Sequence, residues 1–146
     1  MWFSDDMLEI FENTIKTVIT DCGYKAVIIS MKEHNDNIND QIIAEIRKSK
    51  FIIADFTGNR GGVYFESGFA MGLGKQVIWT CRRDHFNSLI STVVDGTDIK
   101  DNSIHEVKIQ LESKIHFDVD HFNFIIWNNP DELYEKLKNR IEATIL

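Results

Sequence analysis

The sequence predicts an α/β protein whose parallel sheet is covered by helices on both faces. Two observations predict this class. Short apolar runs rich in β-branched residues, which are typical of buried strands, alternate with longer segments whose apolar residues recur at helical spacing. The 146 residues contain no repeat, low-complexity tract or linker. We therefore expect a single domain over residues 1–146.

A first helix is predicted within residues 4–24. Ser4 or Asp5 can cap its start, and Gly23 can end it. Only residues 1–3 precede this helix as a first strand, so either the chain begins inside that strand or a preceding segment is absent from the sequence. One face of the helix carries the apolar residues Leu8, Phe11, Ile15, Val18, Ile19 and Cys22.

The central segments continue the alternation of strands and helices. Residues 24–31 are short and β-branched, which predicts a second strand, and residues 39–50 form an amphipathic helix after a polar loop. A fully apolar strand at residues 51–55 ends in an acid. A glycine-containing loop, a short helix within residues 63–74 and a buried strand at residues 76–81 then follow.

The last third of the chain is less regular. Residues 84–92 and 103–115 are interpreted as helical pieces around a turn at residues 95–98. A final strand is expected at residues 124–127. The chain closes with a helix over residues 128–146, in which proline stands near the first turn and leucines and isoleucines recur every four residues.

Composition excludes several kinds of partner. The formal net charge of −7 repels phosphate backbones, which argues against nucleic-acid binding but allows a small nucleotide in a local pocket. No apolar stretch reaches the roughly 18 residues of a membrane span, and no signal peptide is visible, so we expect a cytoplasmic protein that does not bind membranes. Cys22 and Cys81 read as buried thiols. No metal-ligand spacing occurs, and we expect neither metal nor cofactor.

Two acids stand where a parallel sheet binds ligands, at the carboxyl ends of its strands. Asp55 ends one strand, and Glu66 is expected in the first turn of the next helix, whose dipole keeps a carboxylate ionised. An ionised carboxylate in a partly enclosed cleft can attack an electrophilic sugar carbon. Acids in first turns also serve only to complement the dipole, and Asp55 can simply cap a turn. The two acids alone leave both interpretations open.

For each of the other candidate site residues, a ligand contact competes with a purely structural role. Arg60 lies between glycines and either pairs with a phosphate or is a solvated loop residue. His34, Asn35 and Asp36 follow the second strand, where such residues contact a ligand or form a turn. Residues 116–118 precede the last strand, away from the expected site unless their loop folds back, and a structural role is favoured for them.

The run "SKFIIADFTGNRGGVYFESGFAMGLGKQVIWTC" (residues 49–81) resembles the nucleoside 2-deoxyribosyltransferase-like superfamily. The family signature is an apolar strand ending in Asp, a polar loop, a helix with a Tyr/Phe-Glu-x-Gly-x-Ala core, and Gly-Lys before the next strand. This chain supplies Asp55, Tyr64 to Ala70, and Gly74 with Lys75. Residues 34–51 and the segment from residue 116 to the end also look like a bacterial subgroup of the family.

The resemblance implies a flavodoxin-like (Rossmann-like) three-layer sandwich with a mostly parallel sheet of about five strands. It also implies a homo-oligomeric enzyme that cleaves the bond between a nucleobase and a (deoxy)ribose in a nucleoside or nucleotide. Glu66 would attack the anomeric carbon, and another base (transferase) or water (hydrolase) would then accept the sugar. Asp55 would lie near the sugar or base and assist the leaving group, as in two-carboxylate glycoside chemistry.

Two further possibilities remain at this point. Toll/interleukin-receptor-type domains also place a Glu on a helix and cleave nicotinamide from NAD, and a non-catalytic nucleotide-binding or sensing module fits a shortened first strand. The family pattern has no counterpart to residues 82–116, and Trp2, Phe3 and Ser4 stand in for its first strand. The expected substrate-binding residues are Ser4, Asn35, Asp36, Thr57, Gly58, Arg60, Gly62 and Ser67.

Overall fold

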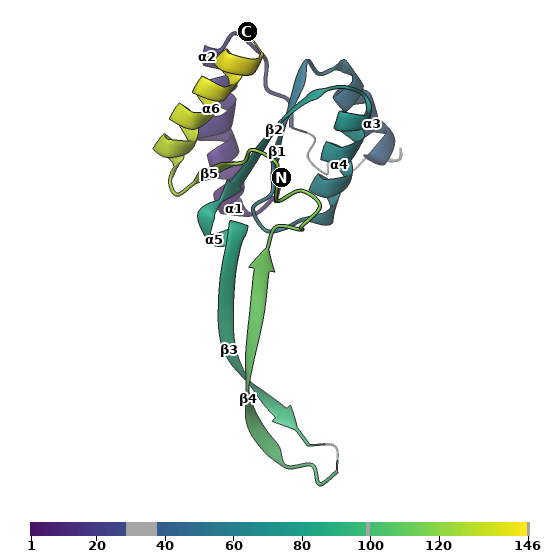
Figure 1. The fold of residues 1–146 in the computed structure, drawn as a ribbon, viewed down its shortest axis with the longest axis vertical. Helices are drawn as coiled ribbons and strands as arrows, with labels where there is room; N and C mark the ends of the chain where they lie inside the picture. Colours follow the sequence, from purple (N-terminus) through teal and green to yellow (C-terminus); the bar gives the residue numbers. More distant parts are fainter. Residues whose placement is uncertain (29–37, 99, 146) are drawn as a thin grey trace.

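A parallel sheet forms the centre of the computed structural model (Figure 1). Its strands β1 (Phe51–Asp55), β2 (Gln76–Arg82) and β5 (Ile125–Trp127) are ordered β1-β2-β5. The register between β1 and β2 runs from Phe51 opposite Gln76 to Asp55 opposite Thr80, and β5 pairs with the last three residues of β2. The predicted α/β class is confirmed. The structure describes residues 1–28, 38–98 and 100–145.

The N-terminal helix is one continuous rod with a π-helical turn in its middle. Its parts are α1 (Asp5–Ile10), η1 (Phe11–Ile15) and α2 (Lys16–Asp21). Gly23 follows with a φ of 82°, as predicted for a helix end. The predicted inward residue Leu8 is exposed, because Met7 lies four residues before Phe11 and takes the buried position instead.

Helices cover both faces of the sheet. On one face, the N-terminal helix and α6 (Pro130–Thr144) pack in one core cluster that includes Ile78 of β2. On the other face, α4 (Gly61–Gly72) and Ile46 of α3 (Ile38–Lys48) pack in a second cluster that includes Val77 and Trp79 of β2. Neighbouring residues of β2 therefore enter opposite layers, as a strand buried on both faces requires.

The C-terminal helix α6 forms as the sequence predicts. Asn129 caps it by accepting a hydrogen bond from the Glu132 backbone N–H at 2.9 Å, and Pro130 occupies the first position. Leu133, Leu137 and Ile141 are buried. These side chains recur every four residues, so they form one continuous stripe against the sheet.

The predicted first strand is wrong, because residues 1–4 lie outside any helix or strand. Residues 24–28 of the predicted second strand also lie outside any strand, and the rest of that segment lies outside the described residues. A strand needs a hydrogen-bonded neighbour, which neither segment has among the described residues. Tyr24, Ala26 and Ile28 nevertheless pack against the core while Lys25 and Val27 are exposed, and this alternation is typical of an extended chain.

The predicted helices at 84–92 and 103–115 are wrong. Only α5 (Arg83–Phe86) is helical, and β3 (Asn87–Thr97) and β4 (Ile104–Lys114) form an antiparallel hairpin. We call β3, β4 and their connection the arm, because they project far from the body (Figure 1). Apolar residues alternate with polar ones from Val107 to Leu111 of β4, and this period of two is a strand signal, whereas the apolar residues of β3 stand in adjacent pairs.

Candidate functional site

The carboxyl group of Asp55 joins the two central strands where they end. One oxygen accepts a hydrogen bond from the Thr57 backbone N–H at 3.0 Å, and the other accepts from the Thr80 hydroxyl at 2.7 Å. The exposed fractions are 1% for Asp55 and 0% for Thr57 and Thr80. Each oxygen therefore compensates the burial of the carboxyl group and fixes the start of the following loop.

The loop after β1 turns back sharply under an aromatic ring. Gly58 and Asn59 have φ values of 81° and 50°. A Cβ atom on Gly58 would lie 2.9 Å from Cε3 of Trp2, so the indole rests directly on the loop backbone. Only glycine fits this approach without displacing the ring. The Thr57 hydroxyl accepts a hydrogen bond from the Arg82 backbone N–H at 3.0 Å, which ties the loop to the end of β2.

Glu66 lies in the second turn of α4, not in the first. The helix begins at Gly61 and has no acid in its first turn, so the expected dipole interaction at a first-turn position is wrong. The Glu66 side chain is half-buried and extends back along the helix. Its Oε1 atom lies 3.8 Å from the place that a Cβ on Gly62 would take. The absence of a side chain on Gly62 thus leaves one side of the carboxyl group open.

Burial governs the ionisation of Glu66. It raises the pKa of the Glu66 carboxyl above its ordinary value, and the nearby amino group of Met1 offsets part of this rise. Burial also lowers the pKa of the Met1 amino group, against the opposing charges of Glu66 and Asp55. The charges of Glu66 and Asp55 therefore both reach the Met1 amino group. The two carboxyl groups predicted from the sequence lie in the same neighbourhood.

Trp2 connects this neighbourhood to the side chains of Arg60 and His85. The Arg60 guanidinium lies over the indole at 4.9 Å from its centroid, and the His85 ring meets the indole edge at 5.9 Å. Arg60 is thus an exposed loop residue that is held by an aromatic ring. Trp2 was a candidate site residue from the sequence because residues 1–4 stand in for the first strand of the family that the chain resembles, whose end lines the site.

Arg82 is a site-edge residue that the sequence reasoning missed. It bonds Asp6 at 2.9 Å, Asp84 at 2.8 Å and His85 at 3.0 Å. Hydrogen bonds from Ser4 and from Arg82 lower the pKa of Asp6 to about 2. The position of Arg82 directly after the apolar run of β2 was the signal that could have identified it.

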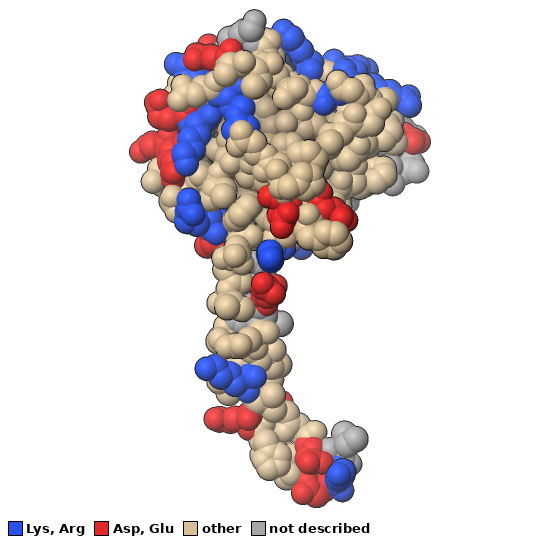
Figure 2. All heavy atoms as spheres, viewed as in Figure 1, with Lys and Arg blue, Asp and Glu red and all other residues tan. Residues whose placement is uncertain are grey.

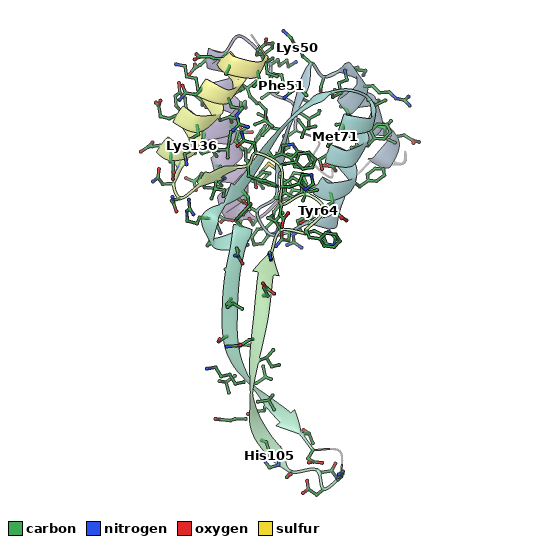
Figure 3. The ribbon with its side chains drawn as sticks, viewed as in Figure 1. Lys50, Phe51, Tyr64, Met71, His105 and Lys136 are labelled. Atoms are coloured by element: carbon green, nitrogen blue, oxygen red, sulfur yellow. The ribbon has the colours of Figure 1, made fainter. Side chains whose placement is uncertain are left out.

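The segment before β5 folds back to the same edge of the sheet. The Tyr64 hydroxyl accepts a hydrogen bond from the His116 backbone N–H at 3.1 Å and lies 3.4 Å from Oδ1 of Asn59. His116 forms an ion pair with Asp118 at 3.2 Å when the imidazole is protonated. Figure 3 shows Tyr64 at the end of the body from which the arm leaves and Phe51 at the far end of the body. Residues 116–118 are thus closer to the site edge than the sequence indicated.

The predicted substrate-binding residues divide into three groups. Thr57, Gly58, Arg60 and Gly62 belong to the loop and helix start between Asp55 and Glu66. Ser67 is buried and donates a hydrogen bond to the Tyr64 carbonyl at 3.1 Å, and Ser4 bonds Asp6 before the first helix. Two predicted residues and a neighbouring candidate lie outside the described residues: Asn35, Asp36 and His34.

Two hollows lie elsewhere on the described surface. Their volumes are about 460 and 300 Å³, and Arg140 lines both. Neither is lined by Glu66 or Asp55. They extend along α6 and the β2–β5 edge. We assign the candidate site from the position of the acids at the carboxyl edge rather than from these hollows, because open parallel sheets bind their ligands at that edge.

Within the described ranges, no three His, Cys, Asp or Glu side chains gather as metal ligands do, and no helix has the length and apolar character needed to cross a bilayer. The case for this site therefore rests on the geometry of its acids, its glycines and the ring of Trp2. Comparisons with family models, with curated proteins and with solved structures give no match to the chain.

Proposed function

We propose that the chain cleaves the N-glycosidic bond of a (deoxy)nucleoside or nucleoside 5′-monophosphate, by hydrolysis or base exchange. Glu66 is the nucleophile and Asp55 is the supporting acid. The observation that carries the proposal is the half-buried Glu66 carboxyl, whose pKa is raised by burial, together with Asp55 at the carboxyl edge of the sheet; both carboxyl groups are within electrostatic reach of the Met1 amino group. An acid with a perturbed pKa at the carboxyl edge of a parallel sheet is typical of a functional site.

The reaction proceeds in two balanced steps. An ionised Glu66 oxygen forms a bond to the anomeric carbon as the bond from that carbon to the base breaks. The bonding electrons leave with the base nitrogen, which takes a proton from an acid in the site or from water. Water or a second base then attacks the same carbon, the bond to Glu66 breaks, and the attacking group releases its proton to solvent. The carboxylate is regenerated.

The contacts of Asp55 define what support it can give. Both of its oxygens already accept hydrogen bonds, from Thr57 and Thr80, so its first role is to fix the loop that lies between the two acids. Its charge also acts on the Met1 amino group, which in turn acts on Glu66. Asp55 therefore fixes the position of the loop and, like Glu66, acts on the Met1 amino group.

Arg60 is the residue that would distinguish a nucleotide from a nucleoside. It is exposed, it follows the tight turn at Gly58, and Trp2 holds its guanidinium from one side. A guanidinium fork binds phosphate oxygens in pairs. We propose that Arg60 binds the 5′-phosphate if the substrate carries one.

The proposal includes the flavodoxin-like arrangement with about five strands. Support comes from residues 24–28, whose alternating burial is that of an extended chain. The ring of Tyr24 meets Phe51, the first residue of β1, at 5.3 Å between centroids. This contact favours a further strand on the β1 side of the sheet.

The test is a substrate panel of deoxynucleosides, ribonucleosides, their 5′-monophosphates and NAD, with free base measured by chromatography. Glu66→Ala is compared with Glu9→Ala, which removes an exposed glutamate from α1. We expect base release by the parent protein and by Glu9→Ala, and none by Glu66→Ala. Turnover of NAD alone would replace the nucleoside proposal with NAD cleavage.

Arg60→Ala then tests the choice of substrate. If a nucleotide is the substrate, the variant loses activity on the monophosphate and keeps activity on the nucleoside, because it removes the phosphate contact and the Trp2 contact of Arg60 but leaves both acids in place. Equal loss on both compounds would contradict a phosphate-binding role for Arg60. Binding of a panel compound without any base release would instead favour a sensing module.

A further inference from the structure

The hollow of about 460 Å³ beside α6 has lining charges of one sign only. Arg83, Lys136 and Arg140 line it, and no acid does, although the chain as a whole has a net charge of −7. Residues 124–126 add apolar surface. Figure 2 shows Lys and Arg side chains gathered over α6 on the face in view. We call this space the cationic hollow, since a concave surface with charge of one sign concentrates ions of the other.

Two of the three cations keep their charge unpaired within the described part of the chain. Arg83 is exposed and forms neither a hydrogen bond nor an ion pair there. Arg140 is half-buried, and its only hydrogen bond there runs from Nη1 to the Asn123 carbonyl oxygen at 3.0 Å, which holds the guanidinium without cancelling its charge. Lys136 is paired with Glu132 at 2.5 Å. Arg83 and Arg140 are therefore the groups that can bind an anion.

Basic side chains already occupy backbone acceptors beside the cationic hollow. The order β1-β2-β5 leaves β5 at an edge of the described sheet. Lys136 donates to the Ile126 carbonyl oxygen at 2.8 Å, and Arg140 binds the Asn123 carbonyl oxygen just before the strand. Basic side chains at an edge strand hinder its pairing with a further strand. The hollow is therefore suited to a small anionic ligand rather than to an added peptide strand.

Arg140 also lines the second hollow, of about 300 Å³, so one side chain faces both spaces. Gln76, Asn123 and Thr144 are among the residues that line this second space, which we call the polar hollow. Amide and hydroxyl groups both donate and accept hydrogen bonds, as the hydroxyls of a sugar and the edge of a nucleobase require. A ligand whose anionic group binds Arg140 can therefore place a polar organic body in the polar hollow.

We propose that the two hollows bind a small organic phosphate, either a sugar phosphate or a nucleoside phosphate, with the phosphate group between Arg83 and Arg140. A guanidinium fork binds phosphate oxygens in pairs. The volume of the cationic hollow falls within the roughly 300–1,000 Å³ of small-molecule sites. The two hollows share no lining residue with the candidate site of Asp55 and Glu66, so the inference is independent of the proposed activity.

Three substitutions separate binding in the hollows from a general effect of charge. Arg83→Gln removes an exposed cation that has no hydrogen bond or ion pair within the described chain, so folding should be unaffected. Arg140→Gln removes the second cation together with its bond to Asn123. Lys138→Gln is the matched control, because it makes the same change of charge on α6, but Lys138 lies over the Tyr134 ring and lines neither hollow.

An NMR titration of nitrogen-15-labelled protein locates the site and measures its affinity. The probes are ribose 5-phosphate, a nucleoside 5′-monophosphate, the same nucleoside without phosphate, and inorganic phosphate. We expect the organic phosphates to move the backbone amide signals of Ile126, Asn139 and Ala143, which line the cationic hollow. Arg83→Gln and Arg140→Gln should each raise the dissociation constant at least about tenfold, and Lys138→Gln less than about twofold. The tighter of the two organic phosphates identifies the source of the phosphate group.

Four results would each overturn the proposal. The first is that these amide signals stay fixed up to about 10 mM of either organic phosphate, including the case in which only signals near Arg60 move. The second is an equal effect of Arg83→Gln and Lys138→Gln. The third is a nucleoside that binds as tightly as its monophosphate, because the phosphate would then contribute nothing. The last is inorganic phosphate that binds as tightly as both organic phosphates, because the organic body would then contribute nothing.

Discussion

Replacing Asp55 should separate its structural role from the chemical role that we propose for it. Asp55→Ala removes the acceptor for two buried donors, the Thr57 backbone N–H and the Thr80 hydroxyl. Each unsatisfied buried donor costs about 1–3 kcal/mol, and the variant also recovers part of the cost of burying a carboxyl group. We therefore expect Asp55→Ala to lower the free energy of unfolding by about 2–5 kcal/mol.

Asp55→Asn is the matched variant. Its amide oxygen can accept from Thr57, and its amide N–H can donate to the Thr80 hydroxyl, so both hydrogen bonds survive with one direction reversed. We expect its stability to stay within about 1 kcal/mol of the parent. If Asp55 also supports the reaction, Asp55→Asn loses base release while it remains folded.

Urea denaturation at neutral pH measures both effects. With an m-value of about 1–3 kcal/mol/M, a loss of about 3 kcal/mol moves the midpoint by about 1–3 M. Asp120→Ala removes an exposed carboxylate and should change stability by less than about 0.5 kcal/mol. An Asp55→Ala protein as stable as the parent, or an Asp55→Asn protein as unstable as Asp55→Ala, would refute the hydrogen-bond reasoning.

Three further predictions follow from the site. Gly58→Ala should lower Tm by about 3–8 °C, because alanine costs about 1–2 kcal/mol at positive φ and its Cβ would meet Trp2. Gly68→Ala adds a Cβ in open space within α4 and should not lower Tm. Thermal melts that show the same loss for both variants would be inconsistent with this reasoning. Burial raises the folded-state pKa of Glu66, so the stability that this group contributes is present at low pH and is lost as pH rises through the folded pKa. The gain in Tm from Glu66→Gln should therefore be larger at pH 8 than at pH 4. A gain in Tm that is independent of pH would contradict this reasoning. Tyr64→Phe removes the acceptor of the His116 backbone N–H and should cost about 1 kcal/mol in urea denaturation, whereas an unchanged midpoint would mean that water replaces the hydroxyl.

Local pattern predicted the central sheet because each strand carries its own signal. The runs at residues 51–54 and 77–79 are apolar throughout, and they lie in the paired strands β1 and β2. Helix α6 carries a cap, a proline and a stripe of leucine and isoleucine in the right order. In these segments propensity, patterning and packing all favour the same structure, so the local sequence is sufficient.

The arm was missed because its two strands support each other. Ser103 to Ile115 contains apolar residues that fit both a period of two and a loose helical spacing, and only the pairing with β3 decides between them. Pairing is a long-range property that a window of neighbouring residues does not contain. The assignment of Glu66 to the first turn failed for a related reason, since α4 begins at Gly61 rather than at Val63.

The contacts around the candidate site also depend on distant parts of the chain. The sequence identified Asp55, Gly58, Arg60 and Glu66 because they are close together along the chain. It gave no means of placing Trp2 on Gly58 or His116 beside Tyr64, which are separated by more than fifty residues. Such contacts arise from the packing of whole elements against the sheet.

The central claim is that Glu66 forms a covalent bond to the sugar, and an acid quench during turnover of the best panel substrate tests it most directly. Digestion and mass spectrometry then locate any adduct. The account predicts an added (deoxy)ribosyl group on the peptide that contains Glu66, and neither adduct nor base release with Glu66→Gln. An adduct on any other residue, or turnover by Glu66→Gln at the rate of the parent protein, would contradict it.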